Sequence, residues 1–164
     1  MRPAGGAEAG AATNTMVDRH QARILAMQSL CQLEVLADDF AEDLDAFLAE
    51  ETESSAARAY ARELVREVWS NLEAVDQAIQ AVAEHWEIKR MATVDRNTLR
   101  VAVGELLYRP GVPAAVVINE AVEIGKTFGA ADSGAFINGI LDGVARRRAE
   151  AAAAKAEQST GVDG

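Results

Sequence analysis

Apolar side chains recur every three or four residues along most of the chain, which is the spacing of amphipathic α-helices. No sustained alternation of apolar and polar positions indicates a strand, so the pattern predicts an all-α fold, a compact seven-helix bundle. The predicted helices cover residues 18–36, 44–49, 54 or 55–70, 72–86, 93–108 and 113–128, and the seventh begins at 132 or 133. We expect its Ala-rich tail from residue 149 to become disordered by residue 158.

Polar residues mark the helix ends. Asp18 is a candidate N-cap, Pro113 suits a first helical turn, Gly129 suits the residue after a helix, and Asp132 or Ser133 suits the start of the seventh helix. Trp86 falls on the apolar stripe of the fourth predicted helix. We expect a disordered tail over residues 1–15, a folded domain over 16–150 and a disordered tail over 151–164.

The acidity of the chain is local. The formal net charge is −10, but residues 34–53 carry nine acids and no Lys or Arg, and the remainder has 17 acids against 16 bases. An acidic patch of this kind leaves room for a neutral or basic surface elsewhere, so the charge does not exclude RNA as a partner.

The residue inventory argues against an enzyme, a metal site and a bound cofactor. Cys31 is the one candidate nucleophile, and His20 lies about 16 Å away if both are on one helix, so a structural cysteine is favoured. No glycine-rich phosphate loop is present. No apolar run suits a membrane span or a secretory signal, and a lone cysteine fits a reducing cytoplasm.

Two groups of polar residues have both a structural and a binding interpretation. Arg19 and Arg23 lie one helical turn apart, so they form either a solvated face or a contact with a phosphate backbone. Asp132 either caps a helix or helps that helix end to face a ligand. Phe136, one turn further on, is either a core residue or a ring that stacks on a base.

Two long segments carry a family resemblance. These are VDRNTLRVAVGELLY at 94–108 and VPAAVVINEAVEIGKTFGAADSGAFINGILDGVA at 112–145, preceded by the pair Trp86 and Arg90. From about Arg19 to Arg147 the chain resembles the bacterial transcription antitermination factor NusB family. The resemblance implies a NusB-like fold of seven helices in two three-helix sub-bundles. It also implies a non-enzymatic role, which is binding the boxA element of nascent ribosomal RNA transcripts together with the ribosomal protein NusE, within the antitermination complex of RNA polymerase.

The resemblance also assigns candidate site residues. By motif, the RNA-facing residues are Arg19, Arg23, Gln28, Asp132, Ser133 and Phe136. Asp95 falls on the side that meets the protein partner, and Arg96 and Arg100 lie near that surface by position. The family often has consecutive arginines at the start of its first helix, whereas this chain reads Arg19-His20-Gln21-Ala22-Arg23, and Cys31 replaces a common aromatic. Fewer phosphate contacts predict weaker RNA binding by the free protein.

Three hypotheses follow. The first is an RNA-binding antitermination subunit. The second is a protein–protein interaction module of the same fold with weak or no independent RNA binding. The third, ranked last because the chain holds no catalytic motif, is the accessory helical domain found fused to RNA cytosine methyltransferases. Both a monomer and a homodimer are compatible with the resemblance.

Overall fold

The computed structural model describes the backbone of residues 5–161 and the side chains of residues 15–161. Over that range the chain forms seven α-helices and one short 3-10 helix, with no strand, as the apolar spacing predicted. The helices belong to two compact units, Met1–Asn71 and Leu72–Gly164. No helix in the described part is long and apolar enough to cross a membrane.

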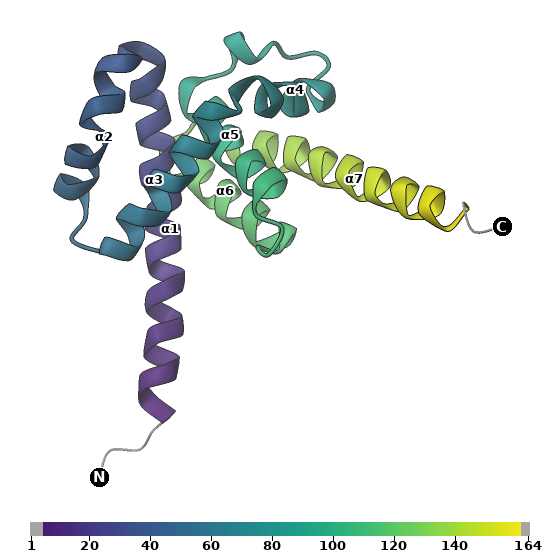
Figure 1. Cartoon of the computed structure of the whole chain (residues 1–164). Coiled ribbons are helices and arrows are strands. Elements are labelled where there is room, and N and C mark those ends of the chain that lie inside the picture. Colours follow the sequence, from purple (N-terminus) through teal and green to yellow (C-terminus); the bar gives the residue numbers. More distant parts are fainter. Residues whose placement is uncertain (1–4, 162–164) are drawn as a thin grey trace. The chain divides into compact units, whose positions relative to one another are not determined.

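The first unit consists of α1 (Gly5–Leu36), α2 (Asp38–Glu51) and α3 (Ser55–Ser70), which pack pairwise against one another. Figure 1 shows them as the purple and blue ribbons. One apolar stripe from each helix makes the core, and its fully buried large members are Met27, Leu30, Leu48, Leu64, Val65 and Val68. Burying such side chains contributes about 1.5–3 kcal/mol each, which is why the stripes decide the packing.

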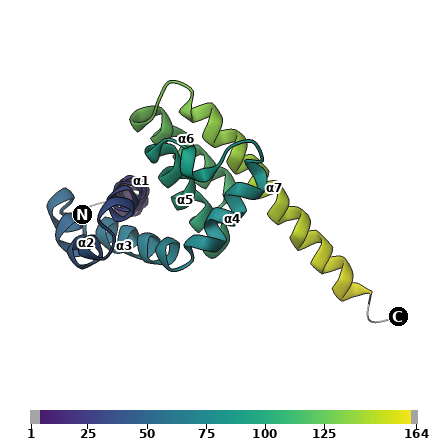
Figure 2. The ribbon, with the colours of Figure 1, turned by 90° about the horizontal axis from the view of Figure 1, so that it is seen from above.

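The second unit holds four α-helices, one more than the expected sub-bundle. They are α4 (Leu72–Val82), α5 (Thr93–Tyr108), α6 (Ala114–Phe128) and α7 (Ser133–Thr160), and the 3-10 helix η1 (Ile88–Arg90) lies between α4 and α5. The central helix is α5, which packs against α4, α6 and α7 (Figure 2). Its residues from Leu99 to Leu106 are buried all round, and the core also takes Val75, Ile79, Val117, Ile137 and Leu141.

Several predicted boundaries were wrong. The helix α1 begins at Gly5 instead of near Asp18, and α2 begins at Asp38 instead of Leu44. The Ala-rich end of α7 stays helical to Thr160, because alanine has the highest helix propensity. The assignment of disordered tails stays a prediction, and residues 1–4 and 162–164 lie outside the described range.

The predicted fourth helix was too long. It ends at Val82, and Trp86, expected on its apolar stripe, is instead 60% exposed. Periodicity extended the helix through Trp86 because that residue lies four positions after Val82. The side chain of Gln80 instead bonds the backbone beyond the helix and supports a turn there.

Candidate functional site

The start of the predicted basic face is held by polar contacts within the first unit. Asp18 does not cap a helix; its Oδ1 accepts a hydrogen bond from Ser54 Oγ at 2.8 Å, and Ser54 is the N-cap of α3. Gln21 Oε1 accepts from Thr52 Oγ1 at 2.9 Å. These contacts tie α1 to the loop between α2 and α3, and they fix the rotation of α1 at the position of Arg19 and Arg23.

Arg19 and Arg23 share the ring of Tyr60 on α3. The Cζ atoms lie 5.4 Å and 6.0 Å from the ring centroid, within the range of a cation–π contact. Arg19 is exposed, but Arg23 is 4% exposed. The two arginines therefore do not form a uniformly solvated face. Tyr60 is half-buried, and its ring contacts both arginines; it was not among the predicted site residues.

Gln28 and Cys31 lie further along α1 and are both half-buried. The Cys31 thiol donates to Met27 Sδ at 3.9 Å. This contact with a neighbouring thioether fits the structural role expected for the cysteine. No set of three His, Cys, Asp or Glu side chains among the described residues could hold a metal ion.

The corner between α6 and α7 is locked by Ser133, not by Asp132. Ser133 is fully buried, and its Oγ accepts a hydrogen bond from Ala130 N at 2.8 Å. In return Ser133 N donates to Ala130 O at 3.1 Å. A Cβ atom on Gly129 would lie 2.5 Å from Ser133 Oγ, so the absence of a side chain at Gly129 permits this close approach.

Asp132 occupies the N-cap position of α7, but its side chain makes no capping hydrogen bond. It is exposed, whereas Ser133 beside it is buried and held by the backbone. Of the three predicted residues at this corner, Asp132 and the half-buried Phe136 are accessible, and Ser133 positions the turn.

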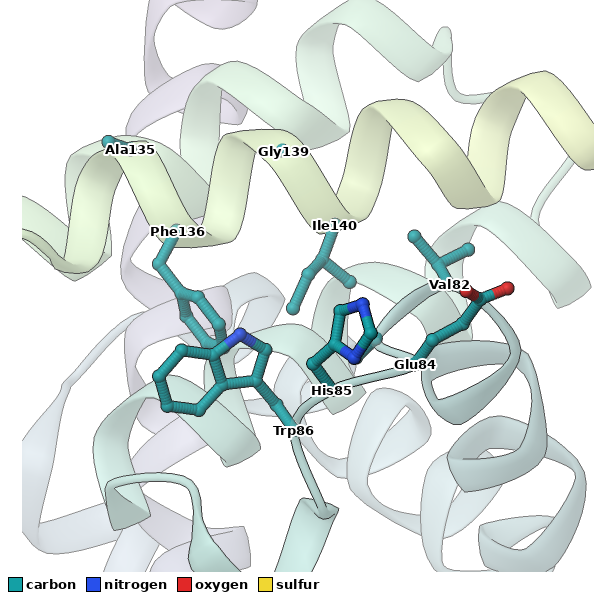
Figure 3. A pocket seen from close by; sticks show the side chains of 9 residues that line it. Val82, Glu84, His85, Trp86, Ala135, Phe136, Gly139 and Ile140 are labelled. Atoms are coloured by element: carbon teal, nitrogen blue, oxygen red, sulfur yellow. The ribbon is translucent and has the colours of Figure 1, made fainter.

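Phe136 lies beside Trp86, which was not among the predicted site residues. Its ring meets the Trp86 indole edge-on, with centroids 6.0 Å apart and an interplanar angle of 77°. The two rings line a hollow of about 390 Å³ between the end of α4 and α7, named here the Trp86 pocket, whose other walls include His85, Gly139 and Ile140. Figure 3 shows Phe136 reaching from α7 toward the indole.

The head of α5 holds the three residues assigned to a protein partner. Asp95 is 9% exposed, and its Oδ1 is buried without a hydrogen-bond partner. Arg96 Nη1 donates to the carbonyls of Met91 at 2.8 Å and Ile88 at 3.3 Å. Arg100 forms two bonds of 2.8 Å with the Asp76 carboxylate on α4. Arg96 and Arg100 both form hydrogen bonds within the unit. Their assignment to the partner surface rested on their position in the sequence, which did not reveal these bonds.

The acidic helix α2 is coupled to α3 by one close contact. Arg62 Nε donates to Asp45 Oδ1 at 2.5 Å. This hydrogen bond, with the charge of Arg62 and of Arg66 adding to it, lowers the pKa of Asp45 below its usual value. The other acids of α2 face solvent at most positions, with Phe40, Leu44 and Leu48 as its buried stripe.

The family model of the NusB family matches residues 20–146. The transcription antitermination protein NusB of Citrifermentans bemidjiense is 44% identical over 138 residues, which cover 79% of this chain and 95% of that protein. The structure of T. maritima NusB is similar with a TM-score of 0.69 at 38% identity, covering 78% of this chain and 90% of that one.

A second solved structure contains antitermination factors NusB and NusE in complex with double-stranded RNA. The matched chain in it has a TM-score of 0.72 at 26% identity, over 80% of this chain and 98% of that one. The family match covers most of the chain, including Arg23 on α1, the head of α5 and the corner before α7. The chain therefore belongs to the NusB family.

Proposed function

We propose that this protein is a cytoplasmic, non-enzymatic transcription antitermination factor. It binds the boxA element of nascent ribosomal transcripts together with NusE and acts within the antitermination complex of RNA polymerase. The observation that carries the proposal is the family match over residues 20–146, because relatives matched at 44% identity are transcription antitermination proteins. The similar NusB structure with NusE and RNA supports the choice of partners.

Each unit is proposed to supply RNA-facing residues of its own. Arg19 supplies an accessible positive charge on α1, and its Cζ lies 5.4 Å from the centroid of the Tyr60 ring. Asp132 and Phe136 supply the accessible part of the corner before α7. In this proposal Arg23 and Ser133 act by positioning, since both side chains are buried. Gln28 is half-buried, so its predicted RNA contact uses the exposed part of its side chain.

The NusE surface is proposed to include the head of α5. Asp95 is 9% exposed, and its Oδ1 is buried within the unit. A backbone N–H or a cationic side chain of the partner is proposed to meet the exposed edge of this carboxylate. Arg96 and Arg100 shape this surface through their contacts with Met91 and Asp76.

The test is a titration of boxA RNA and a scrambled RNA, with and without NusE. Arg19→Ala is expected to weaken boxA binding several-fold and to lower the slope of log K against log salt by about one. Arg66→Ala, which removes the same charge from an exposed position of α3, is the matched control and leaves the slope unchanged. If neither form prefers boxA and NusE does not bind, the proposed function is wrong.

The burial of Arg23 favours a second candidate, an interaction module with weak or no independent RNA binding. In that case the partner complex forms with the same affinity in Arg19→Ala, and RNA binding is weak in the wild type as well. Light scattering at two concentrations tests in parallel whether the chain forms a homodimer.

A further inference from the structure

We propose that the Trp86 pocket receives one base of single-stranded RNA, with the Trp86 indole as its stacking platform. This inference rests on the proposed function and adds a residue and a site to it. The hollow measures about 390 Å³, which is at the lower end of the range of roughly 300–1,000 Å³ for small-molecule sites and suits a single planar ring system.

The exposure of Trp86 is the first argument. A tryptophan side chain that is 60% exposed leaves a large apolar face in water, while the core of the same unit is closed around α5. Its contact with Phe136 is edge-to-face at 77°, so the two rings are not stacked in parallel. An exposed indole face of this kind binds bases by stacking, which is how proteins hold unpaired nucleotides.

The backbone that carries Trp86 is fixed by side chains, which is the second argument. Gln80 Nε2 donates to Ala83 O at 2.8 Å and to Trp86 O at 2.9 Å. Its Oε1 accepts from Ile88 N at 3.2 Å. One glutamine thereby holds both ends of the exposed turn. A binding residue on a preorganised turn loses less conformational entropy when its ligand arrives.

The free space beside Gly139 is the third argument. A Cβ atom on Gly139 would meet nothing within 4 Å, although this glycine lies in the middle of α7. Glycine there costs the helix about 0.5–1 kcal/mol relative to alanine, and no neighbouring atom of the chain requires it. Gly139 is one of the residues that line the pocket, and Figure 3 shows it on the same helix as Phe136 and Ile140.

The exposed polar wall of the pocket favours RNA over an apolar protein anchor. His85 provides ring nitrogens at this wall. The exposed charges nearby have both signs, because Glu84 lines the pocket and Arg90 Nε on η1 lies 3.5 Å from Glu87 Oε2. The exposed Lys89 is a cation beside the aromatic platform, which suits a base and its phosphate. An apolar side chain of a protein partner would favour a pocket that excludes water, whereas the lining residues His85, Trp86 and Gly139 are all exposed.

The binding experiment uses the full chain with NusE and boxA RNA. Trp86→Ala is expected to weaken RNA binding by about 5- to 100-fold, the loss typical of removing one stacking aromatic, and Trp86→Phe to retain most of the affinity. Gly139→Leu is expected to weaken binding by filling the pocket. Gly139→Ala is its control, because a single methyl group leaves most of the space. Thermal unfolding of each variant checks that the fold is retained.

Two further measurements assign the base. A set of boxA RNAs, each lacking the base at one position, should identify the base that stacks on Trp86. When that base is missing, Trp86→Ala should cause no further loss of RNA affinity, because the stacking partner is already absent. In a Trp69→Phe background, Trp86 is the sole tryptophan, and its fluorescence should be quenched by boxA RNA.

The outcomes are separable from those of the proposed function. If the wild type prefers boxA but Trp86→Ala and Gly139→Leu bind it within twofold of the wild type, the pocket proposal is overturned and the function stands. If Trp86→Ala weakens NusE binding equally without RNA, the pocket holds a protein side chain and the proposal is also overturned. If boxA is not preferred but single-stranded RNA quenches Trp86, the function fails and the pocket stands.

Discussion

The corner before α7 can be tested through Ser133→Ala. The resemblance to the family places Ser133 on the RNA-facing side, but the structure buries it completely and uses its hydroxyl to hold Ala130 N. The variant is expected to lower the free energy of unfolding, because it removes an acceptor at 2.8 Å and leaves a backbone N–H without its partner.

The magnitude follows from the single bond lost. An intramolecular hydrogen bond contributes about 0.5–1.5 kcal/mol net, and an unsatisfied donor costs about 1–3 kcal/mol when it is buried. The bond to Ala130 N is partly buried, so we expect a loss of about 1–2 kcal/mol. For a chain of this length that corresponds to a fall in Tm of about 2–8 °C.

The assay is thermal unfolding followed by circular dichroism, with Ser159→Ala on the exposed end of the same helix as the matched control. The control is expected to change the stability by less than about 0.5 kcal/mol. A Tm for Ser133→Ala within 1 °C of the wild type, together with a loss of boxA affinity, would refute the assignment of Ser133 as the corner lock and would favour a direct RNA contact.

Three further predictions concern the framework. Gly139→Ala should raise the free energy of unfolding by about 0.5–1 kcal/mol, whereas Gly143→Ala should lower it because the new methyl group would overlap Val82 Cγ1; urea titrations that ranked the two variants the other way would contradict this. Arg100→Ala should cost about 2–4 kcal/mol by the same measurement, since it breaks both bonds to Asp76, and Arg100→Lys should recover only part of this; a loss under 1 kcal/mol would show that the pair is not structural. Asp45→Asn should lower the stability at neutral pH, and the difference from the wild type should shrink in acid, because the pKa of Asp45 is lowered by Arg62 in the folded state, so its contribution is complete above the unfolded value near 3.8 and is lost as the pH falls through the folded value; a difference that stayed constant as the pH fell would exclude this cause.

Local sequence predicted most of the helical framework. Thr93–Tyr108 was predicted at both ends, and Ser54 was correctly placed at the start of α3, because capping residues and the apolar period are local properties. The end of α4 was missed because Trp86 continues the period of that helix in sequence. The hydrogen bonds of Gln80 to residues 83, 86 and 88 support the turn, and periodicity does not detect them.

The sequence identified the residues of the candidate site, but only partly whether each one contacts a ligand or holds the fold. The motif residues could be named from the corner sequence and the arginines of α1, and the family match includes the corner and Arg23. Which of them reach solvent could not be predicted, because exposure depends on the neighbouring helix. Arg23 is buried beside the Tyr60 ring, and Ser133 is buried against Gly129, although Arg19 and Asp132 next to them in the motif are exposed.

The sequence by itself determined the all-α class, most helix positions and the family, because these depend on period, caps and motifs within short stretches. The tertiary structure decided which polar residues hold the fold and which are available to a ligand. In the structure Asp18 accepts a hydrogen bond from Ser54 instead of capping a helix, and Arg100 is bonded to Asp76. Trp86 lies against Phe136 at the edge of a pocket. Each of these outcomes depends on side chains from separate elements meeting in space, and such meetings leave no periodic signal along the chain.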